Sequence, residues 1–145
     1  MQEILFICTG NYYRSRYAEA LFNHEASRRG LNWRAFSRGV AVWLAPTDGL
    51  SPHAKQRMIE RGIPAAPARA RPTQLDEQDL LRASRVIALK ETEHRAIIAR
   101  LHPGWENKIE YWEISDLDLA TAATALAAIE EKVETLLADL SGAQG

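Results

Sequence analysis

Strand-like and helix-like segments alternate along this chain of 145 residues, and that order constrains its fold more than any other feature. Short apolar runs predict strands over residues 3–8, 33–40, 85–90 and 108–114. Longer stretches with apolar residues at helical spacing predict helices over 15–30, 51–62, 76–83, 91–101 and 121–140. This order is typical of an α/β protein with a mostly parallel sheet and helices on both faces. The length fits a single domain, residues 1–145, with one core.

The first strand and the last helix indicate what lies in the core. The run EILFIC (3–8) is nearly continuous in apolar residues, which is the pattern of a strand buried on both faces. The last helix carries one apolar stripe: Leu126, Ile129, Val133, Leu136, Leu137 and Leu140. In folds of this class, ligands bind at the carboxyl ends of the strands, beside a helix N-terminus. The segment from Cys8 to Ser15 is therefore the predicted ligand site.

Composition excludes several other classes of protein. Apolar residues make up 46% of the chain, charged residues 26%, and the formal net charge is −1. These values do not predict a nucleic-acid surface or a polybasic membrane contact. No stretch has the length of a transmembrane helix, and the N-terminus does not resemble a signal peptide. A single cysteine cannot form an internal disulfide or a cysteine-rich metal site. Together these features lead us to expect a cytoplasmic domain with a free thiol.

The segment ICTGNYYRS (7–15) contains residue types that are suited to an anion-binding loop. Gly10 and Asn11 are residue types that tolerate the left-handed backbone of a tightly curled loop. A curled loop turns its N–H groups inward, and with the following helix N-terminus they form a concave site of phosphate size. Arg14 can close that site by binding two oxygens of the anion with its planar guanidinium.

The same segment can supply a nucleophile. A thiol beside a helix N-terminus and an arginine loses its proton more easily, so Cys8 is expected to be largely thiolate at neutral pH. Ser15 can donate a hydrogen bond to that sulfur. A thiolate beneath a bound phosphorus centre is the arrangement for covalent catalysis. The alternative is that Cys8 is only a small buried hydrophobe, and that Gly-Asn is only a turn.

The stretch ICTGNYYRSRYAEALF resembles the signature of the low-molecular-weight protein tyrosine phosphatases, roughly V-C-x-G-N-x-C-R-S-P-x-A-E. The resemblance covers nearly the whole chain. Further matching segments are SRGVAVW (37–43), SPHAKQRMIERGI (51–63), DLLRASRVIALKETEH (79–94) and IEYWEISDLDLA (109–120). It implies a flavodoxin-like fold with a four-stranded parallel sheet, of the phosphotyrosine phosphatase I type.

The resemblance also implies a two-step hydrolysis of a phosphomonoester without a metal or another cofactor. Cys8 would attack phosphorus to form a phosphocysteine, while Arg14 and the loop amides hold the oxygens. By position, Asp116 would be the general acid and then the base. Asp118 is the alternative, because Leu117 replaces the proline of the family's Asp-Pro motif. Both aspartates could instead cap the last helix or lie in solvent.

Substrate contacts follow from the same resemblance. The expected substrate-binding residues are Thr9, Gly10, Asn11, Tyr12, Tyr13, Ser15 and Trp43. Asn11 and Ser15 match organisers of the loop, and Trp43 matches an aromatic residue on the rim. A tryptophan of the core or the surface is the alternative for Trp43.

This sequence departs from the family pattern at several positions. Tyr13 replaces a second loop cysteine, which in the family can form a disulfide with the nucleophile and protect it from oxidation. Arg16 replaces a proline and Arg38 a small residue, so both side chains reach the mouth and make it more positive, or both point to water. Ala68 stands where a histidine that supports the loop is expected. The aromatic residues after the Asp-Pro motif are missing, which leaves Tyr12 as a possible substitute and puts phosphotyrosine preference in question.

The expected partner is a phosphorylated substrate, either a phosphotyrosine protein or a small phosphomonoester, with phosphate or a similar oxyanion in the loop. Neither nucleic acid nor membrane is an expected partner. Two alternatives to a phosphatase stay open. One is a non-catalytic or weakly active phosphate-binding module. The other is an arsenate reductase-like enzyme, which would need an external thiol because the chain has no further cysteine.

Overall fold

The computed structural model describes residues 1–46, 50–64, 71–115 and 121–144. Its sheet has four strands, all parallel, in the order β2-β1-β3-β4. The strands are β1 (Gln2–Cys8), β2 (Trp33–Gly39), β3 (Arg85–Ala88) and β4 (Glu110–Tyr111). The predicted four-stranded parallel sheet is confirmed. The fourth strand is shorter than its sequence pattern predicted, because it is an edge strand that pairs only with β3.

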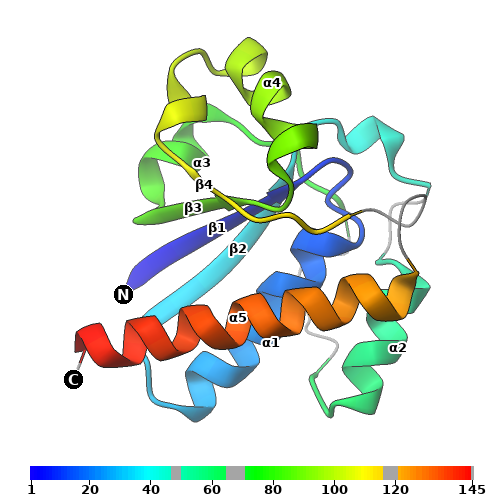
Figure 1. The fold of residues 1–145 in the computed structure, drawn as a ribbon, viewed down its shortest axis with the longest axis vertical. Coiled ribbons are helices and arrows are strands. Elements are labelled where there is room, and N and C mark those ends of the chain that lie inside the picture. Colours follow the sequence, from blue (N-terminus) through cyan, green and yellow to red (C-terminus); the bar gives the residue numbers. More distant parts are fainter. Residues whose placement is uncertain (47–49, 65–70, 116–120, 145) are drawn as a thin grey trace.

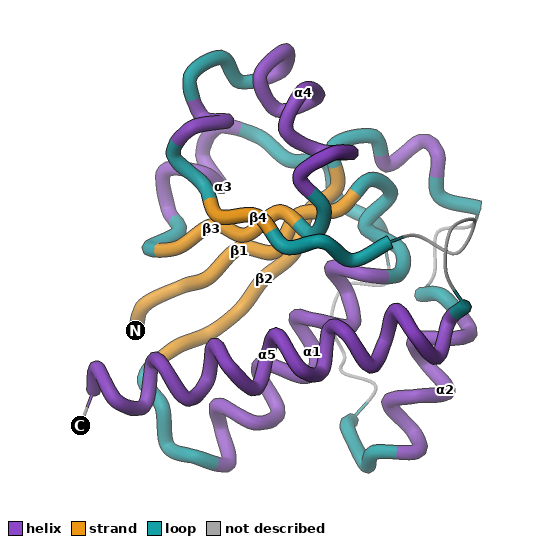
Figure 2. Tube along the Cα trace, in the orientation of Figure 1, coloured by secondary structure: helices purple, strands orange, loops and turns teal. Residues whose placement is uncertain are grey.

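Helices cover both faces of this sheet (Figures 1 and 2). On one face lie α1 (Arg14–Arg28) and α5 (Ala122–Gln144), with α2 (Pro52–Glu60) packed beside them. On the other face lie α3 (Glu77–Arg82) and α4 (Glu91–Leu101). The five predicted helices are confirmed. Two short 3-10 helices, η1 (Val42–Leu44) and η2 (Trp105–Asn107), were not predicted.

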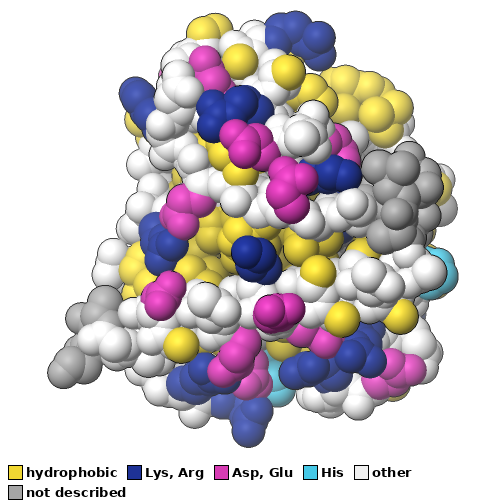
Figure 3. Space-filling model, viewed as in Figure 1, with side chains coloured by type: hydrophobic (Ala, Val, Ile, Leu, Met, Phe, Trp, Pro, Cys, Tyr) yellow, Lys and Arg dark blue, Asp and Glu magenta, His cyan; other side chains and the backbone are white. Residues whose placement is uncertain are grey.

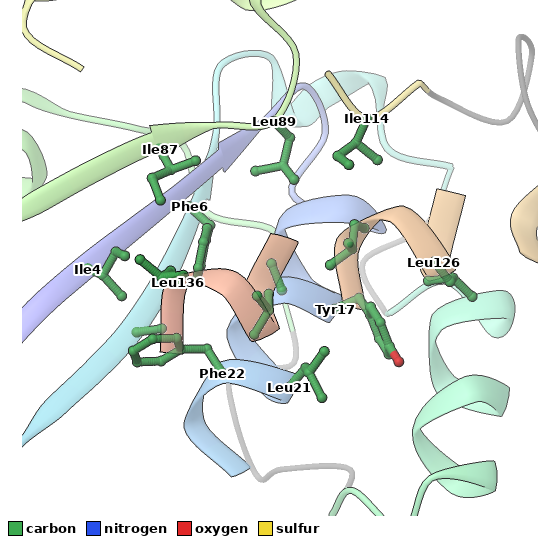
Figure 4. Packing of buried hydrophobic residues seen from close by; sticks show 14 of the residues in the cluster. Ile4, Phe6, Tyr17, Leu21, Phe22, Ile87, Leu89, Ile114, Leu126 and Leu136 are labelled. Carbon is green, nitrogen blue, oxygen red and sulfur yellow. The ribbon is translucent and has the colours of Figure 1, made fainter. Parts of the chain in front are cut away.

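Strand β1 is central, and its side chains divide between two cores. Ile4 and Phe6 point to the face covered by α1 and α5, and Leu5 and Ile7 point to the face covered by α3 and α4. All four side chains are fully buried, which explains why the run has no polar alternation. Figure 4 shows Ile4 and Phe6 packed with residues of the two long helices. The predicted stripe of α5 belongs to the same cluster.

Because the strands are parallel, their carboxyl ends meet at one edge of the sheet (Figure 1). Strand β1 ends at Cys8, and its register partner Gly39 ends the neighbouring strand. The segment after β4 continues beside the end of β3, since the Ile114 N–H donates to the Leu89 carbonyl at 2.8 Å. Three segments distant in sequence therefore meet next to Cys8.

The surface mixes charges of both signs, as expected for a net charge of −1. Figure 3 shows basic and acidic side chains side by side on one face. Several form ion pairs with residues of α5, such as Arg57 with Glu130 and Arg29 with Glu134, both at 2.7 Å. Within the described part of the chain, no helix has both the length and the apolar character needed to cross a membrane.

Candidate active site

Residues 9–13 form the loop that joins β1 to α1 at this edge. Asn11 has a φ of 52° and is the one non-glycine residue with positive φ in the described ranges. The predicted left-handed backbone is therefore confirmed for Asn11. Gly10, the other residue type that tolerates this backbone, is not among the glycines with positive φ. Gly10 instead faces Ala45, whose atoms would lie 3.5–3.6 Å from an added Cβ, an ordinary contact distance.

The carbonyl groups of this loop point outward into hydrogen bonds with neighbouring segments. The carbonyls of Cys8, Thr9 and Tyr12 accept from the backbone N–H groups of Val40, Ala41 and Ser51 at 3.0, 2.9 and 3.0 Å, respectively. In a trans peptide, each C=O points opposite to the N–H that follows it. The N–H groups of Thr9, Gly10 and Tyr13 therefore point into the loop. Convergent amides of this kind can bind an anion, and the anion site itself stays a prediction.

The Asn11 side chain fixes this loop from behind. It is fully buried, and its Nδ2 donates to the hydroxyls of Ser15 and Ser37 at 2.9 and 3.0 Å. Its Oδ1 accepts from the Thr73 N–H at 2.9 Å. The amide thus joins the loop to α1, β2 and the segment around residue 73. The arrangement supports the predicted role of Asn11 as an organiser of the loop.

Cys8 lies at the base of the loop and is 2% exposed. Its Sγ is 2.8 Å from the Ser15 hydroxyl, which is itself fully buried. That hydroxyl also accepts from Asn11, and in its contact with Cys8 either the hydroxyl or the thiol can be the donor.

Arg14 is the first residue of α1 and is 2% exposed. Its Nη1 donates to the Ile114 carbonyl at 2.9 Å and to Glu93 Oε1 at 3.2 Å. Its Nη2 donates to Glu93 Oε2 at 2.7 Å. The guanidinium therefore joins the loop to the first turn of α4 and to the segment after β4.

Glu93 is a residue of this site that the sequence analysis missed. Its Oε2 also accepts from the Thr9 hydroxyl and lies 3.1 Å from the ring Nε2 of His94. Burial by itself raises the pKa of Glu93, but hydrogen bonds from His94, Arg14 and Thr9 outweigh it and hold that pKa well below its usual range. The carboxylate is therefore ionised at neutral pH.

A pocket of about 180 Å³ opens above the loop. Its walls are Cys8, Thr9, Gly10, Tyr12, Tyr13, Arg14, Leu44, Ala45 and Pro46. Cys8, Arg14 and four of the predicted substrate-binding residues are thus brought together. Asn11 and Ser15 lie behind the loop, fully buried. Trp43 is next to the wall residue Leu44 but is itself 72% exposed and is not part of the wall, so its rim role stays a prediction.

Asp116 and Asp118 lie outside the described residues, as does Ala68. The chain that leads to Asp116 is anchored beside the loop. The Ile114 carbonyl accepts from Arg14, and the Ser115 hydroxyl accepts from Lys90 Nζ at 3.0 Å. The role of Asp116 as the acid stays a prediction.

The residues that depart from the family pattern make hydrogen bonds or ion pairs within the protein. Tyr13 is 5% exposed and donates to the Ala122 carbonyl at 3.2 Å, which joins the loop to α5. Arg16 is 8% exposed and donates to the Asn11 carbonyl at 3.4 Å. Arg38 pairs with Asp79 at 2.9 Å. Neither arginine is a wall residue of the pocket or points freely to water, so both alternatives drawn from the sequence were wrong.

Gly39 closes the loop from the side of β2, which gives a first prediction. A Cβ at this position would lie 2.7 Å from the Thr9 carbonyl oxygen and 2.9 Å from the Asn11 nitrogen. Gly39→Ala should therefore displace the loop backbone, lower the free energy of unfolding by about 1–3 kcal/mol and weaken binding of inorganic phosphate. Urea unfolding and phosphate titration measure the two effects.

Gly142→Ala is the matched control, because a Cβ there meets no atom within 4 Å and the residue lies on α5. It should leave phosphate binding unchanged. If Gly39→Ala retains wild-type stability and phosphate affinity, the close approach of β2 does not shape the loop.

A metal site has no support among the described residues: they contain no group of three or more His, Cys, Asp or Glu side chains placed to hold a metal ion.

Comparison with known proteins shows that the chain is similar to phosphatases. A family model described as low molecular weight phosphotyrosine protein phosphatase matches residues 3–144. A protein-arginine-phosphatase from Bacillus subtilis (strain 168) is 32% identical over 107 residues, covering 74% of this chain and 67% of that protein. The low molecular weight protein-tyrosine-phosphatase YfkJ from the same organism is 34% identical over 127 residues, covering 81% and 77%.

A solved structure shares the whole fold. It is a cysteine-to-serine mutant of the YwlE arginine phosphatase with a phosphorylated active site serine. Its TM-score is 0.79 at 27% identity, and the match covers 97% of this chain and 96% of that one.

Proposed function

Because the chain belongs to the low-molecular-weight phosphotyrosine protein phosphatase family and is a cysteine-dependent phosphatase, we propose that its substrate is phosphotyrosine in proteins and that Cys8 is the nucleophile. The observation that carries the proposal is the position of Cys8. Its sulfur lies at the wall of the pocket, below amides that point inward and beside a buried guanidinium.

In the first step, the sulfur of Cys8 attacks phosphorus. A P–S bond forms while the P–O bond to the tyrosine ring breaks. The loop amides and Arg14 hold the other three oxygens as their charge rises toward the transition state. Asp116 gives its proton to the departing oxygen, so that tyrosine leaves as a neutral phenol.

In the second step, Asp116 acts as a carboxylate base. It takes a proton from water, and the water oxygen attacks the phosphorus of the phosphocysteine. The P–S bond breaks, and its electrons return to Cys8 as the thiolate. Inorganic phosphate leaves, and the enzyme regains its starting protonation state.

The pocket wall favours an aromatic substrate. Tyr12, Leu44 and Pro46 offer flat or apolar surface above the phosphate position. Among the described wall residues, none is acidic, so this part of the wall offers no opposite charge to the positive guanidinium of phosphoarginine. A phenyl ring buries apolar surface against the same wall.

Phosphoarginine in proteins is the second candidate substrate. The similarity to a protein-arginine-phosphatase, at 32% identity, supports it. The P–N bond of phosphoarginine can be broken by the same thiolate, with Asp116 protonating the leaving nitrogen. A small phosphomonoester is the third possible substrate from the sequence. A cytoplasmic location of the protein stays a prediction.

A comparison of peptide substrates tests the assignment. We expect kcat/KM for a phosphotyrosine peptide to exceed that for a phosphoarginine peptide of the same sequence by about tenfold or more, because only the ring is complementary to the wall. Release of inorganic phosphate measures both rates. A phosphoserine peptide and the Cys8→Ser protein are the controls. Equal or faster hydrolysis of phosphoarginine would assign the enzyme to that substrate instead.

Turnover on these substrates also separates the remaining alternatives. A phosphate-binding module without catalysis would bind inorganic phosphate but hydrolyse none of the peptides. An arsenate reductase-like enzyme would reduce arsenate only with an added thiol, such as glutathione.

A further inference from the structure

Glu93 holds the guanidinium of Arg14 by two of its nitrogens at once. The two carboxylate oxygens face Nη1 at 3.2 Å and Nη2 at 2.7 Å, which is a bidentate pair. The Arg14 side chain is 2% exposed, and the Glu93 side chain is 29% exposed. The residues are 79 positions apart, and the parallel sheet brings them together by placing the start of α4 beside the loop after β1.

Other groups hold the carboxylate in place. The backbone N–H of Lys90 donates to Nδ1 of His94 at 3.1 Å, so the ring proton of a neutral His94 lies on Nε2. That nitrogen is 3.1 Å from Glu93 Oε2 and 3.1 Å from the Thr9 hydroxyl. The Thr9 hydroxyl donates to the same carboxylate oxygen. Every described neighbour of Oε2 is therefore a donor, and an ionised carboxylate is the group that satisfies them all.

Glu93 lies outside the anion site itself. Its described contacts are with the side chains of Thr9, Arg14 and His94, and none is with the loop amides or with Cys8. It uses the Nη1–Nη2 edge of the guanidinium. The Nε–Nη2 edge has the spacing to bind two phosphate oxygens. The carboxylate thus orients the guanidinium from the side of its Nη1–Nη2 edge.

We propose that Glu93 is the positioning residue that holds Arg14 in the orientation needed to bind the transferring phosphoryl group, an inference that rests on the proposed phosphatase function. Arg14 also donates to the Ile114 carbonyl, two residues before Asp116. The Arg14 side chain therefore joins the loop to the segment that carries the proposed acid. Without Glu93, a long side chain with several rotatable bonds loses its two hydrogen bonds to a carboxylate.

The test compares four variants on p-nitrophenyl phosphate. Glu93→Ala removes the contact, and Glu93→Gln places an NH₂ group against donors, so both should lower kcat/KM by about 100-fold. Glu93→Asp keeps the charge but is one methylene shorter, and should lose about tenfold. Glu91→Gln is the matched control, because Glu91 lies in the same helical turn and pairs with Arg95 instead. It should retain wild-type kinetics.

Inhibition by inorganic vanadate separates positioning from folding. Vanadate occupies the phosphoryl site of folded protein, so its inhibition constant should rise about tenfold in Glu93→Gln while Glu91→Gln keeps the wild-type value. A purely structural role would lower the melting temperature of Glu93→Gln but leave vanadate affinity and kcat/KM of the folded protein unchanged. That outcome would overturn the inference.

Two further outcomes are distinguishable. If Glu93→Gln does not fold, Glu93→Asp decides, and wild-type kcat/KM in that variant would contradict the inference. If the wild-type protein itself hydrolyses no phosphate ester, the proposed function fails, and with it the role of Glu93. Hydrolysis that depends on Cys8 but not on Glu93 overturns the positioning role alone.

Discussion

Cys8→Ser is expected to reduce hydrolysis of p-nitrophenyl phosphate to background, a loss on the order of 10⁴-fold or more in kcat. A serine hydroxyl ionises far less readily than a thiol, so the loop would hold phosphate without an effective nucleophile. Stopped-flow release of p-nitrophenol measures the effect. The wild-type protein should show a burst of p-nitrophenol, because the phosphocysteine forms faster than water removes it. The variant should show no burst.

Binding of inorganic phosphate provides the control for this variant. The substitution replaces one buried small side chain by another, and it leaves the loop amides and Arg14 in place. Phosphate affinity and melting temperature should therefore stay close to those of the wild type. Turnover by Cys8→Ser at the wild-type rate would show that the sulfur takes no part in the reaction.

Asp116→Asn is expected to lower kcat by about 10²–10⁴-fold, which is the usual contribution of a general acid or base. Asparagine has nearly the same size but no proton to give and no charge to accept one. The loss should be larger for phenyl phosphate than for p-nitrophenyl phosphate, since p-nitrophenol leaves readily without protonation. Steady-state kinetics on the two esters measures the difference.

Asp118→Asn is the matched variant, because the two aspartates are separated only by Leu117. We expect it to retain most of the wild-type kcat. A larger loss in Asp118→Asn than in Asp116→Asn would assign the acid to Asp118. Equal rates in both variants and the wild type would mean that neither aspartate transfers a proton.

The fold could be predicted because its main features are local in the sequence. A strand buried on both faces needs a continuous apolar run, and residues 3–8 have one. A long helix that packs against a sheet needs one apolar stripe. Ile129 and Val133 lie fully buried in the stripe of α5. The edge strand β4 was predicted too long, because the apolar pattern continues where the pairing has ended.

The candidate site could be predicted only where its residues lie close together in the sequence. The loop, the left-handed Asn11 and the hydrogen bond of Ser15 to Cys8 all lie within eight residues. Glu93 was missed because its contact with Arg14 depends on the order of strands in the sheet. One signal was available: Glu93 follows a predicted strand whose carboxyl end lies at the same edge as that of residues 3–8.

Arg16 and Arg38 show a second limit of the sequence. Their types suggested either a positive mouth or a solvated surface. In the fold, each guanidinium is largely buried and binds an acceptor of the protein, the Asn11 carbonyl or Asp79. Which acceptor lies within reach of a long side chain depends on packing, and no local pattern reports it.

The most direct test of the central claim is acid quench of the wild-type protein during turnover of a phosphotyrosine peptide, followed by mass spectrometry of its peptides. We predict one phosphoryl group on the peptide that contains Cys8, attached to sulfur. A phosphoryl group on another residue, or turnover of the peptide with no phosphoenzyme, would contradict the mechanism.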